Sequence, residues 1–246
     1  MRPDVEETLE AFRAGLHEIL GDELVAAYVF GSAVTGDLSP ASSDVDFLVV
    51  TERPLEDGRV RRLSELHRDL AARYAWGGRL EGGYAARDQL RPWGLDGPIA
   101  ALEPGRPLEA GVPSTHGPGN MLAIREAGRA LAGPPGAEIL PEVDARTLER
   151  GIRGYLEELL AHGRAGEEPE VHELASRTLD VARCLYTLAH RRPSTKTEAA
   201  QWLACRQPRL APVLAAASAI RAGGAGEDAA RVLRAGFPDL QAEAEQ

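Results

Sequence analysis

The sequence predicts a chain of two parts: a mixed α/β domain over residues 1–118 and an all-α helical bundle over residues 119–246. Short apolar runs alternate with helical patterns in the first part, which is typical of strands and helices packed on one another. Helical spacing alone runs through the second part. A stretch rich in proline and glycine, residues 91–119, separates the two patterns and predicts the domain junction.

Apolar spacing and chain breakers define the elements of the first part. Residues 25–30 and 47–50 are apolar runs of strand length, whereas the apolar positions of residues 55–74 recur at helical spacing. Gly21 ends the first helical pattern. Strands are therefore expected at residues 25–30, 47–50 and 79–86, and helices at residues 4–20 and 55–74. Residues 91–119 are expected to form a long loop.

The second part is expected to be helical throughout. Helices are predicted at residues 120–132, 144–162, 170–190, 195–206, 208–222 and 227–235. Its two cysteines, Cys184 and Cys205, lack C-x-x-C spacing, so we interpret them as reduced core thiols of a cytoplasmic protein. No apolar run approaches the roughly 18 residues of a membrane span, and the N-terminal residues lack the apolar stretch of a signal peptide. No membrane partner is expected.

The charge of the chain narrows the class of partner. The formal net charge is −10, and no basic stripe interrupts it. Such a chain is a poor candidate for binding nucleic acid, whose phosphates need Lys and Arg. An acidic cleft would instead attract a small cationic substrate. The plain alternative is that the acidity serves solubility alone.

The densest chemical signal is Phe30-Gly31-Ser32 followed by Asp44-Val45-Asp46, placed between two predicted strands. Alternate residues of a strand share a face, so Asp44 and Asp46 are expected side by side. Two close carboxylates repel unless a cation joins them, and Mg²⁺ with its preference for oxygen ligands would fit. Gly31 lets the backbone approach a phosphate, and Ser32 adds a donor. The alternative is a solvent-facing loop in which Asp44 caps a turn.

Glu81 is a candidate third carboxylate. It stands on the predicted third strand, beside Gly82 and Gly83, which leave room around it. If this strand pairs with the strand of Asp46, the two carboxylates reach the same cleft, where Glu81 would serve as the base that a phosphoryl acceptor needs. The alternative is an exposed glutamate with no role.

Two cations of the helical part point to an anion. Lys196 is the only lysine of the chain, and it stands in the first turn of a helix capped by Ser194 or Thr195. A positive charge there opposes the helix dipole, so an anion such as a triphosphate is expected beside it. Arg183 stands on the preceding helix; its alternative role is a surface ion pair with Asp180, three residues earlier.

The first motif resembles the G-S-x(n)-D-x-D signature of the DNA polymerase β-like nucleotidyltransferase superfamily. The resemblance implies a nucleotidyltransferase-fold mixed sheet, a divalent metal site at Asp44 and Asp46, and a turn at Gly31 and Ser32 that holds the nucleotide's β- and γ-phosphates. Three parts agree with the signature: the strand before the turn, the spacing, and the strand after the aspartates.

The helical part is similar to the C-terminal domain of the aminoglycoside 3''-adenylyltransferases, which inactivate streptomycin and spectinomycin. Residues 178–188 resemble that family's L-x-x-x-R-x-x-Y-T run, and residues 194–202 its S-K-x-x-A-x-x-W run. The resemblance implies that Glu81 is the catalytic base and that Arg183 and Lys196 contact the ATP phosphates.

The acceptor side of the resemblance is less complete. Glu173 aligns near a family aspartate that meets the aminoglycoside, and Asp180 is expected to join it against the ammonium groups of the acceptor. However, the family's aromatic-rich segment after the third strand is not matched, since residues 94–101 contain no aromatic side chain.

Together these features predict an ATP- and Mg²⁺-dependent enzyme, a cytoplasmic monomer, that transfers AMP to a hydroxyl of a small cationic acceptor such as an aminoglycoside. The alternative is a regulatory nucleotidyltransferase-fold module that acts on a protein partner, as antitoxins of this fold do. Those antitoxins are much shorter and lack an appended bundle with residues like Arg183 and Lys196, which favours the enzyme.

Overall fold

The computed structural model of the chain describes residues 1–162, 169–224 and 226–245. Its contacts group into two compact units: Met1–Leu38 with Ser43–Asp144, and Ser39–Ser42 with Ala145–Gln246. A mixed sheet with helices forms the first unit and helices form the second. The predicted fold class is therefore confirmed.

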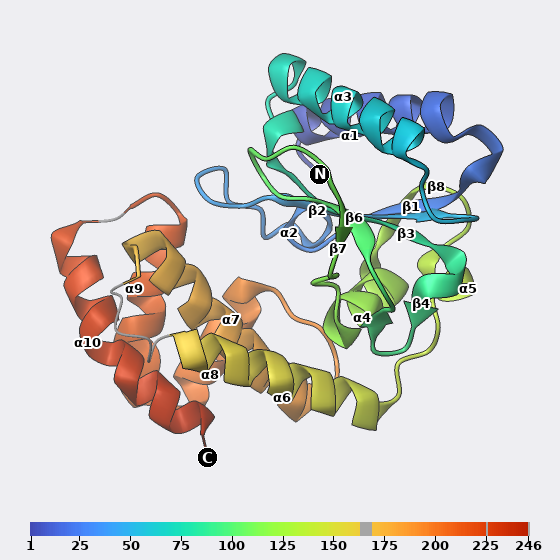
Figure 1. Cartoon of the computed structure of the whole chain (residues 1–246). Coiled ribbons are helices and arrows are strands. Elements are labelled where there is room, and N and C mark those ends of the chain that lie inside the picture. Colours follow the sequence, from blue (N-terminus) through green and yellow to red (C-terminus); the bar gives the residue numbers. More distant parts are fainter. Residues whose placement is uncertain (163–168, 225, 246) are drawn as a thin grey trace. The chain divides into compact units, whose positions relative to one another are not determined.

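The first unit contains eight strands and five α-helices within its described residues, and five of the strands, β3 to β7, follow one another without an intervening α-helix (Figure 1). Its strands are β1 (Leu24–Phe30), β2 (Val45–Thr51), β3 (Leu80–Ala86), β4 (Leu90–Arg91), β5 (Gly94–Leu95), β6 (Ile99–Leu102), β7 (Glu109–Val112) and β8 (Arg129–Ala132). Its helices are α1 (Pro3–Leu20), α2 (Ser32–Thr35), α3 (Asp57–Arg73), α4 (Pro118–Ala127) and α5 (Gly136–Ile139). The three strands and two helices predicted before residue 91 are all present.

The main sheet has six strands in the order β7-β6-β3-β2-β1-β8. Strands β2 and β3 are parallel, and every other pair of neighbours is antiparallel. A parallel pair needs a crossover connection, which α3 provides between β2 and β3. This arrangement puts the three predicted strands side by side in the middle of the sheet.

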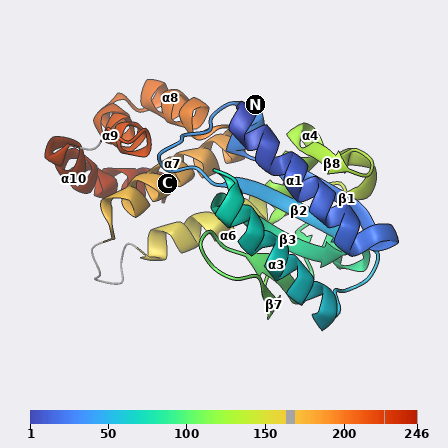
Figure 2. The same cartoon turned by 90° about the horizontal axis from the view of Figure 1, so that it is seen from above.

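Helices cover both faces of the sheet. Figure 1 shows α1 and α3 on one face and α4 with α5 on the other, and Figure 2 shows α1 and α3 lying side by side. The core follows the alternation of the strands: Phe47 packs with Phe12 of α1, whereas Leu48 packs with Met121 and Ile124 of α4. Both faces are apolar because both are buried, which explains the nearly continuous apolar runs of β1 and β2.

A hydrogen-bonded pair lies within the core between α3 and the sheet. The Nε2 atom of His67 lies 2.6 Å from the hydroxyl of Tyr84, and the His67 ring stacks on Phe47 at 5.7 Å between ring centroids. Both side chains are buried. Burial raises the pKa of Tyr84 well above its usual value and lowers the pKa of His67 to about 4, so the imidazole is neutral in the folded protein.

The expectation of a long loop over residues 91–119 is wrong in part. Strand β6 pairs antiparallel with β3, and β7 continues the sheet beyond it. The strands are only four residues long, and the prolines stand in the connections around them. Proline and glycine therefore marked the turns of a hairpin correctly, but their density hid the short strands between them.

The helix predicted at residues 120–132 is also wrong in its second half. Helix α4 ends before Gly128, and Arg129–Ala132 is strand β8, which pairs antiparallel with β1. The short segment is a strand because it completes the edge of the sheet, a tertiary effect that local periodicity does not carry. The contacts divide the chain between Asp144 and Ala145, whereas the sequence predicted the boundary at residue 118.

The second unit consists of helices around α7. Its elements are α6 (Ala145–His162), α7 (Val171–His190), α8 (Lys196–Arg206), α9 (Ala211–Arg221) and α10 (Glu227–Ala244). Helix α7 contacts the other four, which explains why half of its residues are buried. Helix α10 runs beyond the predicted end at residue 235 and contains Pro238, because Phe237 and Leu240 continue its buried face. Within the described part of the chain, no helix combines the length and apolarity needed to cross a bilayer.

The helix that carries Lys196 begins at a side-chain cap. Of the two candidates, Thr195 is the N-cap: its Oγ1 accepts a hydrogen bond from the Glu198 backbone N–H at 2.9 Å.

Cys184 is buried as expected, and burial raises the pKa of its thiol to about 12. Cys205 is exposed, so the prediction that it is a core thiol is wrong; it lies on the outer face of α8 near the helix end.

The loop before β2 belongs by its contacts to the helical unit. The hydroxyls of Ser39 and Ser42 both donate to the carbonyl oxygen of Arg221, at 2.7 and 2.8 Å. That carbonyl lies in the last turn of α9, where backbone acceptors lack partners within the helix. These two hydrogen bonds hold the segment before Asp44 at Ser39 and Ser42.

The buried His67 predicts a pH-dependent loss of stability. Between pH 6.5 and pH 4 the unfolded chain binds a proton that the folded chain does not, so the free energy of unfolding should fall as the pH is lowered, by roughly 3 kcal/mol over this range. Urea unfolding of wild type and His67→Gln at both pH values measures the difference. The His67→Gln variant should lose this part of the slope, while His17→Gln at an exposed position should keep it; an unchanged slope in His67→Gln would contradict the prediction.

Candidate active site

A glycine turn connects β1 to α2 at one end of the sheet. Gly31 has φ 67° and ψ −145°, a conformation that side chains rarely adopt. Its carbonyl oxygen accepts hydrogen bonds from the backbone N–H groups of Val34 and Thr35, at 3.2 and 3.1 Å. Gly36 ends the turn of helix in the left-handed region, at φ 80°. Ser32 is thereby held directly at the end of a buried strand.

Gly31 is required for a second reason, its contact with Asp46. A Cβ atom on Gly31 would lie 2.2 Å from the Oδ2 atom of Asp46. The approach follows from the register of the two strands, in which Phe30 lies opposite Asp46. The glycine therefore leaves space that the Asp46 carboxylate occupies.

Asp46 is the second residue of β2, and Asp44 immediately precedes the strand. Val45 and Phe47 are fully buried, while Asp44 and Asp46 are partly exposed. This alternation places both carboxylates on the face that Leu48 shares, away from α1 and α3. The Oδ1 atom of Asp44 lies 4.0 Å from the Nε atom of Arg79, which precedes β3.

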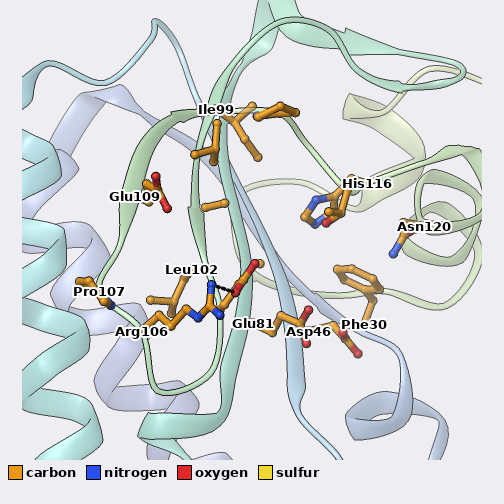
Figure 3. A pocket seen from close by; sticks show the side chains of 16 residues that line it. Phe30, Asp46, Glu81, Ile99, Leu102, Arg106, Pro107, Glu109, His116 and Asn120 are labelled. Atoms are coloured by element: carbon orange, nitrogen blue, oxygen red, sulfur yellow. Dashed lines mark ion pairs between the residues drawn. The ribbon is translucent and has the colours of Figure 1, made fainter. Parts of the chain in front are cut away.

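Glu81 lies directly opposite Asp46 in the parallel pair of β2 and β3. Residues opposite each other in neighbouring strands project to the same face. Phe30, Asp46 and Glu81 therefore form one row across three strands, as Figure 3 shows. The pairing on which the sequence interpretation of Glu81 depended is present.

A pocket of about 300 Å³ lies over this row. Its lining includes Asp46, Glu81, Glu103, Arg106, Glu109, His116 and Asn120. Figure 3 shows Arg106 and Glu109 on one side and His116 with Asn120 on the other. The dashed ion pair joins Arg106 to Glu103 at 2.9 Å. Four of the charged groups on the wall are carboxylates and one is a guanidinium, so the pocket is acidic.

The sequence analysis did not predict one side of the pocket. The hairpin of β6 and β7 contributes Glu103, Arg106 and Glu109 to the lining, but a long loop was predicted in its place. The apolar run of residues 99–102 was the signal available for it. His116 is a single histidine with no motif around it. It is buried, and burial lowers its pKa, so a neutral ring forms that part of the wall.

The two predicted cations of the helical unit meet on one carboxylate. The Nη1 atom of Arg183 lies 3.2 Å from Oδ1 of Asp180, and Nζ of Lys196 lies 3.1 Å from Oδ2 of the same residue. The contact with Asp180 that the alternative interpretation of Arg183 expected is present, although the Asp180 side chain is only 15% exposed. The phosphate-binding role of Arg183 stays a prediction. Lys196 also donates to the Ser176 hydroxyl at 2.7 Å.

Glu173 lies one helical turn before Arg177 and accepts a hydrogen bond from its Nη2 atom at 2.6 Å. The Arg177 side chain is 9% exposed, whereas that of Glu173 is 59% exposed. Glu173 thus presents a carboxylate to solvent that a nearly buried guanidinium already partly neutralises.

The predicted site residues form two groups, with Gly31, Ser32, Asp44, Asp46 and Glu81 in the first unit and Glu173, Asp180, Arg183 and Lys196 in the second.

The carboxylates of the first group fit a hard divalent cation. Asp44, Asp46 and Glu81 offer oxygen ligands, which Mg²⁺ prefers. Across residues 1–162, 169–224 and 226–245, no group of three or more His, Cys, Asp or Glu side chains is arranged to hold a metal alone. Mg²⁺ commonly binds through one or two carboxylates and takes its other ligands from phosphates and water. The two aspartates therefore fit this ion when a nucleotide supplies the rest.

Comparisons with known proteins agree with the geometry. Residues 9–76 match the family described as nucleotidyltransferase domain. The crystal structure of spectinomycin adenyltransferase AAD(9) from Enterococcus faecialis with ATP and spectinomycin is similar, with a TM-score of 0.74 at 18% sequence identity. The match covers 98% of this chain and 99% of that one. No curated protein sequence matches. The predicted resemblance is confirmed for the fold of the whole chain and for its N-terminal domain.

The contact between Gly31 and Asp46 predicts a strong coupling between the two positions. Gly31→Ala should destabilise the protein by more than the roughly 1–3 kcal/mol of backbone strain, because its methyl group displaces the Asp46 carboxylate. In an Asp46→Ala background the same change should cost only the strain.

Urea unfolding of the two single variants and the double variant measures this coupling. Gly36→Ala, which has a positive φ but no atom within 4 Å of its Cβ position, is the matched control for strain alone. Equal costs of Gly31→Ala in both backgrounds would show that the carboxylate does not limit position 31.

Proposed function

We propose that the protein is a nucleotidyltransferase that transfers AMP from ATP to a hydroxyl of a small cationic acceptor, of the aminoglycoside class. The support for the reaction type is the nucleotidyltransferase domain match and the full-length similarity of fold to an adenyltransferase. A cytoplasmic monomer that uses Mg²⁺ and binds no nucleic acid remains the expectation from the sequence.

One observation carries the proposal: the register that places Asp46 opposite Glu81, next to the Gly31 turn. Phosphoryl transfer needs a base for the attacking hydroxyl and compensation for charge on the phosphate. Of the two carboxylates that line one pocket, Glu81 can act as the base, and Asp46 can hold the cation that compensates the charge of the phosphate. A structural role alone would not require carboxylates in this row, since the positions could be apolar like the rest of β2.

Asp44 and Asp46 would hold the magnesium ion. When bound, such an ion neutralises charge that develops on the attacking and leaving oxygens of an in-line displacement. The strand keeps both carboxylates on one face, and the absence of a side chain on Gly31 leaves the space that the Asp46 carboxylate occupies. Arg79, 4.0 Å from Asp44, limits the repulsion between the two aspartates.

The other residues of the chain would bind the nucleotide and move the proton. The turn at Gly31 and Ser32 would hold the nucleotide phosphates, with Arg183 and Lys196 as cationic contacts. Glu81 would accept the proton of the acceptor hydroxyl. The oxygen of that hydroxyl would form a bond to the α-phosphorus of ATP while the bond from the α-phosphorus to pyrophosphate breaks. This role needs a carboxylate that is ionised before the attack, and it typically contributes roughly 10²–10⁴-fold in rate.

The acidic pocket favours an acceptor with ammonium groups. Glu81, Glu103 and Glu109 line it, and only Arg106 opposes their charge among the lining residues of the described chain. Glu173 is a further exposed carboxylate assigned to the acceptor by resemblance. The similar adenyltransferase was solved with ATP and spectinomycin. An aminoglycoside offers both the positive charges and the hydroxyls that this pocket would select.

The regulatory alternative is not favoured. An antitoxin-like module would resemble the nucleotidyltransferase domain alone, whereas the similarity of fold here extends over 98% of the chain and includes the helical unit. Release of pyrophosphate from ATP by the purified protein, tested against a panel of aminoglycosides, distinguishes the two functions. Turnover with at least one of them is expected; ATP binding without turnover for all of them would contradict the acceptor class.

Asp46→Asn should abolish the adenylyl transfer and weaken the binding of Mg-ATP, because an amide is a poor ligand for a hard cation. The matched control is Glu52→Gln. Glu52 directly follows β2, at the end of the strand opposite to Asp46, and lies 3.7 Å from Arg87, which directly follows β3. Thermal unfolding should show that both variants fold. Retention of most of the activity in Asp46→Asn would exclude the proposed metal site.

Glu81→Gln separates the chemical step from nucleotide binding. The amide keeps the shape of the side chain but does not accept the proton, so kcat should fall by at least roughly 10²-fold. The dissociation constant of ATP should stay within about twofold of wild type, as calorimetry would measure. A variant with normal kcat would show that another group is the base.

A further inference from the structure

The contacts of Asp180 differ from those of a substrate-binding carboxylate. Both of its oxygens are used inside the helical unit: Oδ1 by Arg183 at 3.2 Å and Oδ2 by Lys196 at 3.1 Å. The Ser176 hydroxyl lies 3.4 Å from Oδ2 as well. The Asp180 side chain is only 15% exposed, compared with 43% for Arg183 and 21% for Lys196. The Asp180 carboxylate is thus less accessible to solvent than either cation.

The position of Lys196 explains why an anion is needed there. Lys196 is the first residue of α8, whose N-terminal end carries the positive pole of the helix dipole. A partly buried ammonium group at this point is unfavourable without a negative partner. Asp180 supplies that partner from α7. The anion that the sequence required beside Lys196 is therefore already present in the protein.

We propose that Asp180 is a resident counter-ion that pairs with Arg183 and Lys196 between turnovers and competes with phosphate groups for them. It would lower the affinity of the two cations for pyrophosphate, so that this product leaves after each transfer. This inference rests on the phosphate-binding role of Arg183 and Lys196 in the proposed function. It moves Asp180 from the acceptor side, where the sequence interpretation put it, to the phosphate side.

The size of the effect follows from the charges. Arg183 and Lys196 carry two positive charges and Asp180 one negative charge, so the cluster has a net charge of +1, which an asparagine at position 180 would raise to +2. A pyrophosphate held by both cations would lie within a few ångströms of the carboxylate and be repelled by it. Because Arg183 is partly exposed and solvent screens the repulsion, removal of the negative charge should strengthen phosphate binding by about tenfold.

The experiment compares wild type with Asp180→Asn, which keeps the shape and one hydrogen-bond acceptor but removes the charge. Calorimetry with inorganic pyrophosphate measures the affinity, and inhibition of the transfer reaction by pyrophosphate measures the same competition during turnover. The variant should bind pyrophosphate about tenfold more tightly, show stronger product inhibition and have a lower KM for ATP. Asp180→Ser, a second variant without charge, should behave in the same way, and thermal unfolding checks that both variants fold.

Glu198→Gln is the matched control. Glu198 also stands in the first turn of α8, but it pairs with Arg192 at 2.6 Å and with the Tyr186 hydroxyl at 2.7 Å, outside the Asp180 cluster. Its removal should leave the pyrophosphate affinity unchanged. A similar gain in Glu198→Gln would reduce the effect to the net charge of the protein and overturn the specific role of Asp180.

Three further outcomes are distinguishable. Unchanged or weaker pyrophosphate binding in the Asp180 variants would overturn the inference, since Asp180 would then only position the cations. A higher KM for the acceptor with unchanged pyrophosphate affinity would return Asp180 to the acceptor side. Lys196→Ala tests the premise: if it leaves the pyrophosphate affinity of the protein unchanged, the phosphate-binding role of the cations in the proposed function fails, whatever Asp180 does.

Discussion

The register of the three central strands is the constraint on which the rest of the site depends. Phe30, Asp46 and Glu81 form one row because β1 pairs with β2 and β2 with β3 in this alignment and no other. Side chains alternate between faces, so a shift of one residue in β2 would move Asp46 to the buried face beneath α1 and α3 and bring Phe47 to the pocket. The apolar packing of both faces makes such a shift very costly, since Phe47 contacts Phe12 on one face while Leu48 packs on the other.

The glycines of the site allow the close approach that this register requires. Gly31 leaves room for the Asp46 carboxylate, and Gly82 does the same for the backbone of β2, because a Cβ there would lie 2.0 Å from the carbonyl oxygen of Phe47. The sequence analysis expected Gly82 to leave room around Glu81. The backbone of the neighbouring strand β2 occupies that space instead. Two of the glycines near the carboxylates are thus explained by packing of this chain with itself, independently of any ligand.

Sequence reasoning found what local patterns encode. The Gly-Ser turn, the Asp-x-Asp pair and the strand of Glu81 were recognisable because each combines a motif with an apolar run. The hairpin that carries Glu103, Arg106 and Glu109 was missed because its strands are only four residues long and lie among prolines. Residues 129–132 form a strand only because β1 offers them an edge to pair with, which no local pattern contains. The counter-ion role argued for Asp180 likewise depends on α7 and α8 packing together, although its three-residue spacing from Arg183 predicted half of the contact.

The distribution of charge links these elements to the chemistry. The first unit collects carboxylates around its pocket, an arrangement that suits ammonium groups and repels phosphates. In the proposed function, Lys196 at the start of α8 and Arg183 on α7 would offset this repulsion. Asp180 reduces even this positive charge. In the proposed reaction, this contact would keep phosphate binding weaker than two unpaired cations would make it, which would favour the release of pyrophosphate after each transfer.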